Sequence, residues 1–98
     1  MTREVIIRPA AERDIRDARD WYRQIGPKFA DQFTSAVDQA VSLIAENPLA
    51  FQTVHRSVRR VLLRRFPYAL FFVAGDLTVV VLAVLHQSRD PRFAQRRR

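Results

Sequence analysis

A long, mostly apolar stretch near the end of the chain predicts a central β-strand. Residues 77–85 read LTVVVLAVL, and they are followed by the polar residues HQSRD at 86–90 and by Pro91. An apolar run that is rich in β-branched residues and ends in turn-forming residues is typical of a strand buried on both faces. It is far too short to cross a bilayer. The first polar side chains after a central strand lie at the rim of the sheet, so we expect a functional site there.

The first half of the chain predicts one short strand and two helices. Residues 4–8, EVIIR, form the strand. Apolar residues then recur every three or four positions over residues 11–25, which predicts an amphipathic helix that ends at Gly26. A second apolar stripe begins after Pro27, and its helix ends at Asn47. Because only a two-residue turn joins the helices, they should lie antiparallel as a hairpin.

The second half predicts three further strands. Residues 58–66, VRRVLLRRF, and residues 68–74, YALFFVA, are separated by a proline corner, and a two-residue glycine-aspartate loop leads into the strand at 77–86. Residues 49–57 show no period and are expected to form a loop. The order β-α-α-β-β-β predicts an α+β fold, with a helical hairpin packed on one face of a mainly antiparallel four-stranded sheet.

Four arginines fall within the predicted strand 58–66. Side chains alternate between the two faces of a strand. We therefore expect Arg59 and Arg65 to share one face of the sheet, and Arg60 and Arg64 to share the other.

The second face of this sheet lacks an obvious cover. The last two strands are apolar on both faces, whereas one helical hairpin covers a single face. Residues 91–98 can fold back as a short helix capped by Asp90, but Phe93 is the only large apolar residue of that tail. We therefore infer that a partner protein covers the second face. We expect the final residues, Arg96–Arg98, to be frayed.

The charge of the chain is unevenly distributed. Residues 1–50 contain seven basic and eight acidic side chains, whereas residues 51–98 contain ten arginines and only two aspartates. A preference for arginine over lysine can follow from a GC-rich genome, but that does not explain the scarcity of acidic residues. Such asymmetry indicates an acidic partner, for example nucleic acid, an anionic membrane or an acidic protein.

Composition narrows the class of protein further. The chain has 98 residues, which predicts a single domain covering residues 1–98. It has no cysteine, and its N-terminus does not resemble a signal peptide, so we expect a cytoplasmic protein. The two histidines, His55 and His86, are not part of a ligand cluster. No metal, cofactor or membrane partner is expected.

Two motifs resemble a known family. The element order, the junction RRFPYALFF at 64–72 and the closing VVVLAVLHQSRDPRF at 79–93 are similar to the RelE/ParE superfamily of toxins from bacterial type II toxin–antitoxin modules. The resemblance covers nearly the whole chain. It implies a small basic toxin that a cognate antitoxin neutralises by wrapping across the helical hairpin and the sheet. The residues that we expect to contact the antitoxin are Trp21, Tyr22, Phe29, Phe33 and Arg60.

One branch of this superfamily, the RelE-like toxins, cuts messenger RNA on the ribosome. That reaction needs a base, an acid and cations that stabilise a charged transition state. His86 is a candidate acid or base, and Arg60, Arg64 and Arg89 are candidate cations. RelE-like toxins often carry a tyrosine near the C-terminus, whereas the last tyrosine of this chain is Tyr68. The nuclease constellation is therefore incomplete, and we assign no catalytic residue.

The other branch, the ParE-like toxins, binds DNA gyrase. Its members often end the last strand in a leucine-histidine pair followed by arginine and aspartate, as residues 85–90 do here. The motif favours this branch by analogy. We expect target binding by a basic surface composed of Arg59, Arg60, Arg64, Arg65, His86, Arg89 and Arg92.

Simpler interpretations of the same residues remain open. His86 can be a hydrogen-bonded residue at the sheet rim, and Arg89 and Asp90 can form an ion pair or cap the tail. A third functional hypothesis is a basic nucleic-acid-binding module without toxicity. Such a module would need exposed aromatic residues as stacking platforms, whereas Phe66, Phe71 and Phe72 fall in predicted strands that need them for the core.

Overall fold

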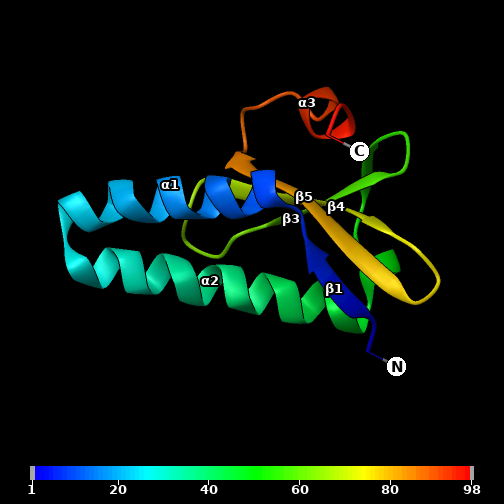
Figure 1. The fold of residues 1–98 in the computed structure, drawn as a ribbon, viewed down its shortest axis with the longest axis horizontal. Helices are drawn as coiled ribbons and strands as arrows, with labels where there is room; N and C mark the ends of the chain where they lie inside the picture. The colour runs from blue at the N-terminus through cyan, green and yellow to red at the C-terminus, as the bar shows by residue number, and fades with distance from the viewer. Residues whose placement is uncertain (1, 98) are drawn as a thin grey trace.

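The chain folds as a helical hairpin packed on a sheet, with a short C-terminal helix on the other face (Figure 1). The structure is a computed structural model, and it describes residues 2–97. The elements are β1 (Glu4–Ile7), α1 (Pro9–Ile25), α2 (Pro27–Glu46), the 3-10 helix η1 (Pro48–Ala50), β2 (Thr53–His55), β3 (Val58–Leu62), β4 (Tyr68–Ala74), β5 (Thr78–His86) and α3 (Arg92–Gln95). The predicted α+β class and the helical hairpin are confirmed.

The sheet has the strand order β1-β5-β4-β3-β2. β5 pairs in parallel with β1 and antiparallel with β4, so the predicted central strand has a neighbour on each side. The sheet has five strands instead of the predicted four, because the segment 49–57 contains β2. Three residues are too few to show a period, and β2 forms by pairing with β3 across a turn in which Arg56 has a φ of 54°.

β3 ends at Leu62, four residues earlier than predicted. The chain turns through Arg64 and Arg65, and Arg65 has a φ of 72°, a left-handed conformation outside the β region. The expected sharing of sheet faces by Arg59 with Arg65, and by Arg60 with Arg64, is therefore wrong. The two later arginines lie outside the strand.

The sheet buries both of its faces. On the helix side, the hairpin covers a core that includes Phe33, Phe72 and Val81, each with no exposed surface. On the other side, α3 packs on a smaller core that includes Phe71 and Leu82 (Figure 1). We expected a partner protein to cover this second face, but the chain's own tail contributes cover, and its buried residue is Ala94.

An aromatic cluster fixes the hairpin against the start of β4. The ring of Tyr22 on α1 stacks on Phe33 of α2 at 5.4 Å between centroids. It also meets the edges of Phe66 at 4.9 Å and Tyr68 at 6.2 Å. Such aromatic pairs add roughly 0.5–1.5 kcal/mol each beyond the burial of their surface. The cluster therefore packs α1 against the start of β4, where Tyr68 contacts the ring of His86 at the end of β5.

Candidate functional site

The polar residues that follow β5 lie at the rim of the sheet, as the sequence predicts. His86 is the last residue of β5 and pairs with Tyr68, the first residue of β4. The chain then turns, and the amide of Gln87 donates to the carbonyl of Pro67 at 2.9 Å. We call residues 86–92 the β5-end site.

Ser88 holds the ring of His86 in place. The amide of Ser88 donates to Nδ1 of His86 at 3.1 Å, and the Ser88 hydroxyl lies 2.8 Å from the same nitrogen. Because Nδ1 accepts the amide hydrogen, the neutral ring carries its proton on Nε2. The exposed ring of His86 therefore presents a hydrogen-bond donor at Nε2.

Asp90 and Arg92 form an ion pair at the start of α3. Both Nε and Nη2 of Arg92 donate to Oδ2 of Asp90, at 2.9 and 2.7 Å, and the Arg92 amide donates to Oδ1 at 2.9 Å. The side-chain hydrogen bonds from Arg92, followed by its amide, lower the pKa of Asp90 to about 2. The pair is exposed and contributes little stability, but it orders the first turn of α3.

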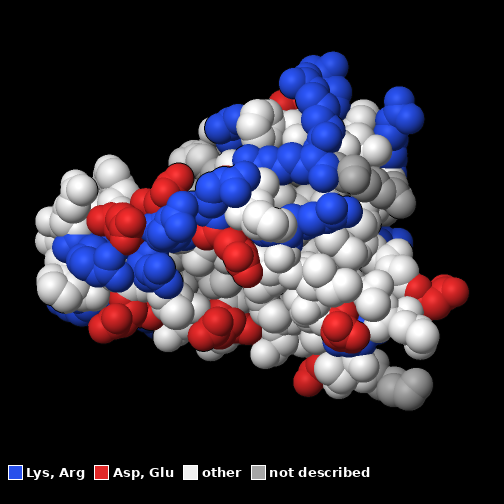
Figure 2. Space-filling view, viewed as in Figure 1, with Lys and Arg blue, Asp and Glu red and all other residues white. Residues whose placement is uncertain are grey.

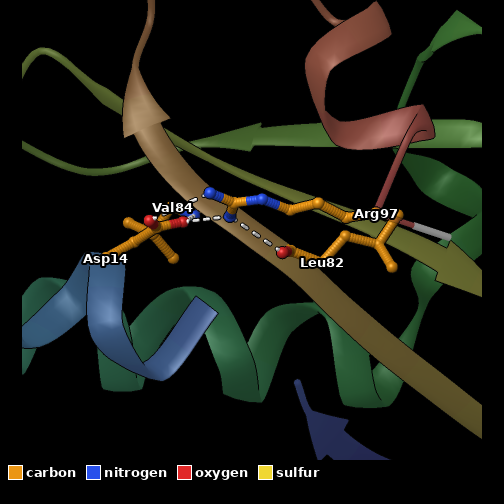
Figure 3. Close-up of polar contacts among 4 residues, drawn as sticks. All are labelled: Asp14, Leu82, Val84 and Arg97. Carbon is orange, nitrogen blue, oxygen red and sulfur yellow. Dashed lines mark hydrogen bonds and ion pairs between the residues drawn. The ribbon is translucent and has the colours of Figure 1, made fainter. Parts of the chain in front are cut away.

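The C-terminal tail is anchored at Arg97, which corrects the expectation of a frayed end for this residue (Figure 3). Nη1 of Arg97 donates to Oδ2 of Asp14 at 2.5 Å and to the carbonyl of Leu82 at 3.2 Å. The same Asp14 oxygen accepts the amide hydrogen of Val84 at 3.0 Å. Asp14 and Arg97 were absent from the predicted site. Arg98, which was also expected to fray, lies outside the described residues.

Phe93 lies beside two arginines. The guanidinium carbon of Arg89 is 4.3 Å from the centroid of the Phe93 ring, and that of Arg97 is 4.9 Å away. Both distances are within the range of cation–π attraction. The ring therefore connects the anchored end of the tail with the β5-end site.

A hollow of about 570 Å³ lies between α1 and the β5-end site. Trp21, which is 56% exposed, lies on its α1 wall, and His86 and Arg89 lie on the opposite wall. Burial, with a smaller effect from Tyr68, raises the pKa of the Tyr22 hydroxyl in this hollow. That hydroxyl therefore stays protonated at neutral pH. The residues that line the hollow are Asp14, Asp17, Ala18, Trp21, Tyr22, Pro67, Tyr68, Val84, Leu85, His86 and Arg89.

The remaining predicted target-binding arginines lie on and after β3. Nη1 of Arg59 donates to the carbonyl of Phe51 at 2.5 Å. Arg60 lies opposite Phe71 of β4 in the sheet. Its side chain is on the face of the sheet that packs against α3, whereas that of Arg59 is on the helix-hairpin face. Arg64 and Arg65 are exposed and line a hollow along α2. The predicted residues thus fall into two groups, the β5-end site and the arginines of β3 and its following turn.

The residues expected to contact an antitoxin are also divided. Trp21 and Tyr22 line the hollow described above. Phe29 is half-buried in the first turn of α2, and Nζ of Lys28 lies 5.3 Å from the centroid of its ring. Phe33 has no exposed surface, so its side chain packs the core and is not available for docking.

Charge is unevenly distributed on the surface. Figure 2 shows basic side chains over α3, whereas basic and acidic side chains lie side by side along the helical hairpin. The β5-end site leads into α3 and contains Arg89 and Arg92, so it lies in a basic part of the molecule. Across residues 2–97, we find no helix with the length and apolar character needed to cross a membrane. The same residues contain no group of three or more side chains suited to hold a metal ion.

Known proteins resemble this chain in sequence and in fold. The family model of the ParE toxin of the type II toxin–antitoxin system parDE matches residues 5–91. The protein named Toxin ParE2, from two strains of Mycobacterium tuberculosis, is 28% identical over 96 residues, which cover 97% of this chain and 91% of that protein.

Two solved structures share the fold. The chromosomal ParDE toxin–antitoxin system from P. aeruginosa matches with a TM-score of 0.75 at 18% identity, over 87% of this chain and 96% of that chain. The toxin–antitoxin complex RelBE2 from Mycobacterium tuberculosis matches with a TM-score of 0.60 at 23% identity, over 88% of this chain and 99% of that chain. Since the family model spans most of the sequence, the chain belongs to the ParE toxin family of type II toxin–antitoxin systems.

Proposed function

We propose that this toxin acts in the cytoplasm by binding DNA gyrase and blocking it, and that a cognate antitoxin neutralises it. Membership of the ParE family supports the first part of the proposal. The second part is supported by the two similar structures, both named as toxin–antitoxin systems. The β5-end site is the proposed contact with gyrase.

The orientation of His86 is the observation that carries this proposal. A nuclease that activates a 2′-hydroxyl needs a base with a free lone pair. In His86 the Nδ1 lone pair accepts from Ser88, so Nε2 carries the proton and the ring is a donor. The Tyr22 hydroxyl, which lines the same hollow, has a raised pKa and stays protonated at neutral pH, so it is not available as a base. A site that offers hydrogen-bond donors and positive charge is suited to binding an acidic surface or a phosphate.

The test is to purify the toxin without its partner and to add it separately to a gyrase supercoiling assay and to ribosomes programmed with messenger RNA. We expect loss of supercoiling, with accumulation of cleaved DNA, and intact messenger RNA. Cut messenger RNA with unaffected gyrase would refute the proposal and would make His86 a catalytic candidate. A His86→Gln variant keeps a donor at this position, and we expect it to retain most of the inhibition of gyrase.

The hollow between α1 and the β5-end site is the proposed seat of the antitoxin. It combines an exposed tryptophan with the exposed carboxylate of Asp17, which favours an amphipathic segment with basic side chains. His86 and Arg89 form the opposite wall. An antitoxin segment seated there would cover the residues that we propose for gyrase binding, and this accounts for neutralisation.

Replacing Trp21 by alanine should weaken binding of the antitoxin and leave the fold intact. A buried interface tryptophan contributes about 2 kcal/mol or more, so we expect the affinity to fall roughly 30-fold or more, as measured by calorimetry. Ile25→Ala is the matched control, because Ile25 is equally exposed, at 56%, on the same helix but does not line the hollow. Equal affinities for both variants would place the antitoxin elsewhere.

A further inference from the structure

β5 continues beyond the strand that covers its edge. β1 ends at Ile7, and the amide of Arg8 makes the last backbone bond from that side, to the carbonyl of Val81 at 3.0 Å. Beyond this point Asp14 accepts from the Val84 amide, and Arg97 donates to the Leu82 carbonyl. Two side chains from distant parts of the sequence therefore satisfy backbone groups that a neighbouring strand would otherwise satisfy.

The ion pair between these side chains holds the tail. The Asp14 and Arg97 side chains are only 14% and 22% exposed, in contrast to the exposed pair of Asp90 and Arg92. α3 has four residues, of which Ala94 is the buried one. A helix of this length does not form alone in water, so its position depends on the contacts at its ends. Arg97 supplies the contact at the C-terminal end (Figure 3).

Phe93 contacts both the arginine that anchors the tail and an arginine of the proposed binding surface. Its ring lies 4.9 Å from the guanidinium of Arg97 and 4.3 Å from that of Arg89. Arg89 also lines the hollow beside His86. If Arg97 released Asp14, α3 would be free to leave the sheet, and Arg89 would lose the ring against which it packs.

We propose that Arg97 is a positioning residue of this toxin: through its ion pair with Asp14 it seats α3, and through Phe93 it fixes the guanidinium of Arg89 for target binding. The last step of this inference rests on the proposed function. In this proposal the tail determines the conformation of Arg89 in the β5-end site. Arg97 itself does not contact the target, because its side chain points towards α1 and β5 (Figure 3).

The test compares Arg97→Ala with Arg96→Ala, which removes the same charge from an exposed neighbour. Three quantities are measured in the full chain: the NMR shifts of the Arg89 side-chain protons, the hydrogen exchange of the Val84 amide, and the potency in arresting growth and inhibiting gyrase. Packing on Phe93 should give Arg89 a ring-current shift. Arg97→Ala should abolish that shift and lower potency about tenfold, whereas Val84 exchange should change little because Asp14 still accepts from its amide. Arg96→Ala should resemble the wild type in all three measurements.

Two further variants separate positioning from folding. Asp14→Asn keeps an oxygen that can accept from the Val84 amide but removes the ion pair, so it should lose the Arg89 shift while Val84 stays protected. Arg97→Lys keeps the charge, and it should restore part of the shift and part of the potency. Melting curves establish that each variant is folded before its potency is compared.

Several results would overturn the inference. An unchanged Arg89 shift in Arg97→Ala would show that the tail does not position Arg89. A lost shift with unchanged potency would show that its position is irrelevant to toxicity. If the wild type arrested growth without affecting gyrase, the proposed target would fail, and the ranking of the variants in growth arrest would decide the role of Arg97. A wild type with neither effect would overturn both proposals.

Discussion

Replacing Val81 by aspartate should prevent the chain from folding. Val81 has no exposed surface and lies on β5, where its neighbours are Ile7 of β1 and Phe72 of β4. A carboxylate at this position would be buried without a partner, which costs more than about 4 kcal/mol. The total stability of a domain of this size is about 5–15 kcal/mol. We expect a circular dichroism spectrum with little helix and no cooperative melt.

Leu77→Asp is the matched control for this prediction. This variant places an aspartate four residues earlier, at a position that lies before β5 and is 75% exposed. Its free energy of unfolding should stay within about 0.5 kcal/mol of the wild type. A Val81→Asp protein that melted like the wild type would contradict the burial of β5 between two strands.

The elements with a strong hydrophobic period could be predicted from the sequence. α1 and α2 each begin at a proline and end where the apolar stripe ends, so their bounds follow from local chemistry. β4 and β5 are apolar on both faces because helices cover one side and α3 packs on the other. The rim position of His86 follows directly from the end of β5.

Other elements depend on contacts that no local pattern reveals. β2 has three residues and forms through its pairing with β3. The sequence favours a partner over the tail as the cover of the second face, because Phe93 is the only large apolar residue of the tail. The structure instead buries the small side chain of Ala94 and anchors the tail through Arg97, whose partner Asp14 is 83 residues away.

The spatial grouping of the predicted binding residues depends on a similar long-range feature. The strand pattern predicts that Arg59, Arg60, Arg64 and Arg65 lie together on one strand, but β3 ends at Leu62, and Arg64 and Arg65 line hollows along α2. Residues of the turn after β5 share one short segment and therefore lie together. The end of β5 is marked by a change from apolar to polar residues, whereas the apolar and basic residues of 58–66 contain no such mark at Leu62.

Replacing Arg89 by glutamate should abolish most of the toxicity. Arg89 lies beside the Phe93 ring and lines the hollow together with His86. Reversing a charge at the centre of an interface costs about 2 kcal/mol or more, so inhibition of gyrase should weaken roughly 30-fold or more. The half-inhibitory concentration in a supercoiling assay measures the effect.

The control for Arg89→Glu is Lys28→Glu, which makes the same change of net charge in the first turn of α2, at the tip of the helical hairpin (Figure 1). Because Lys28 lies far from the β5-end site, its variant should inhibit gyrase like the wild type. Arg64→Glu tests the second group of arginines, and its position along α2 leads us to expect little loss of inhibition. If Lys28→Glu weakened inhibition as much as Arg89→Glu, overall charge would determine binding. If Arg64→Glu alone did so, the turn after β3 would be the target-binding surface in place of the β5-end site.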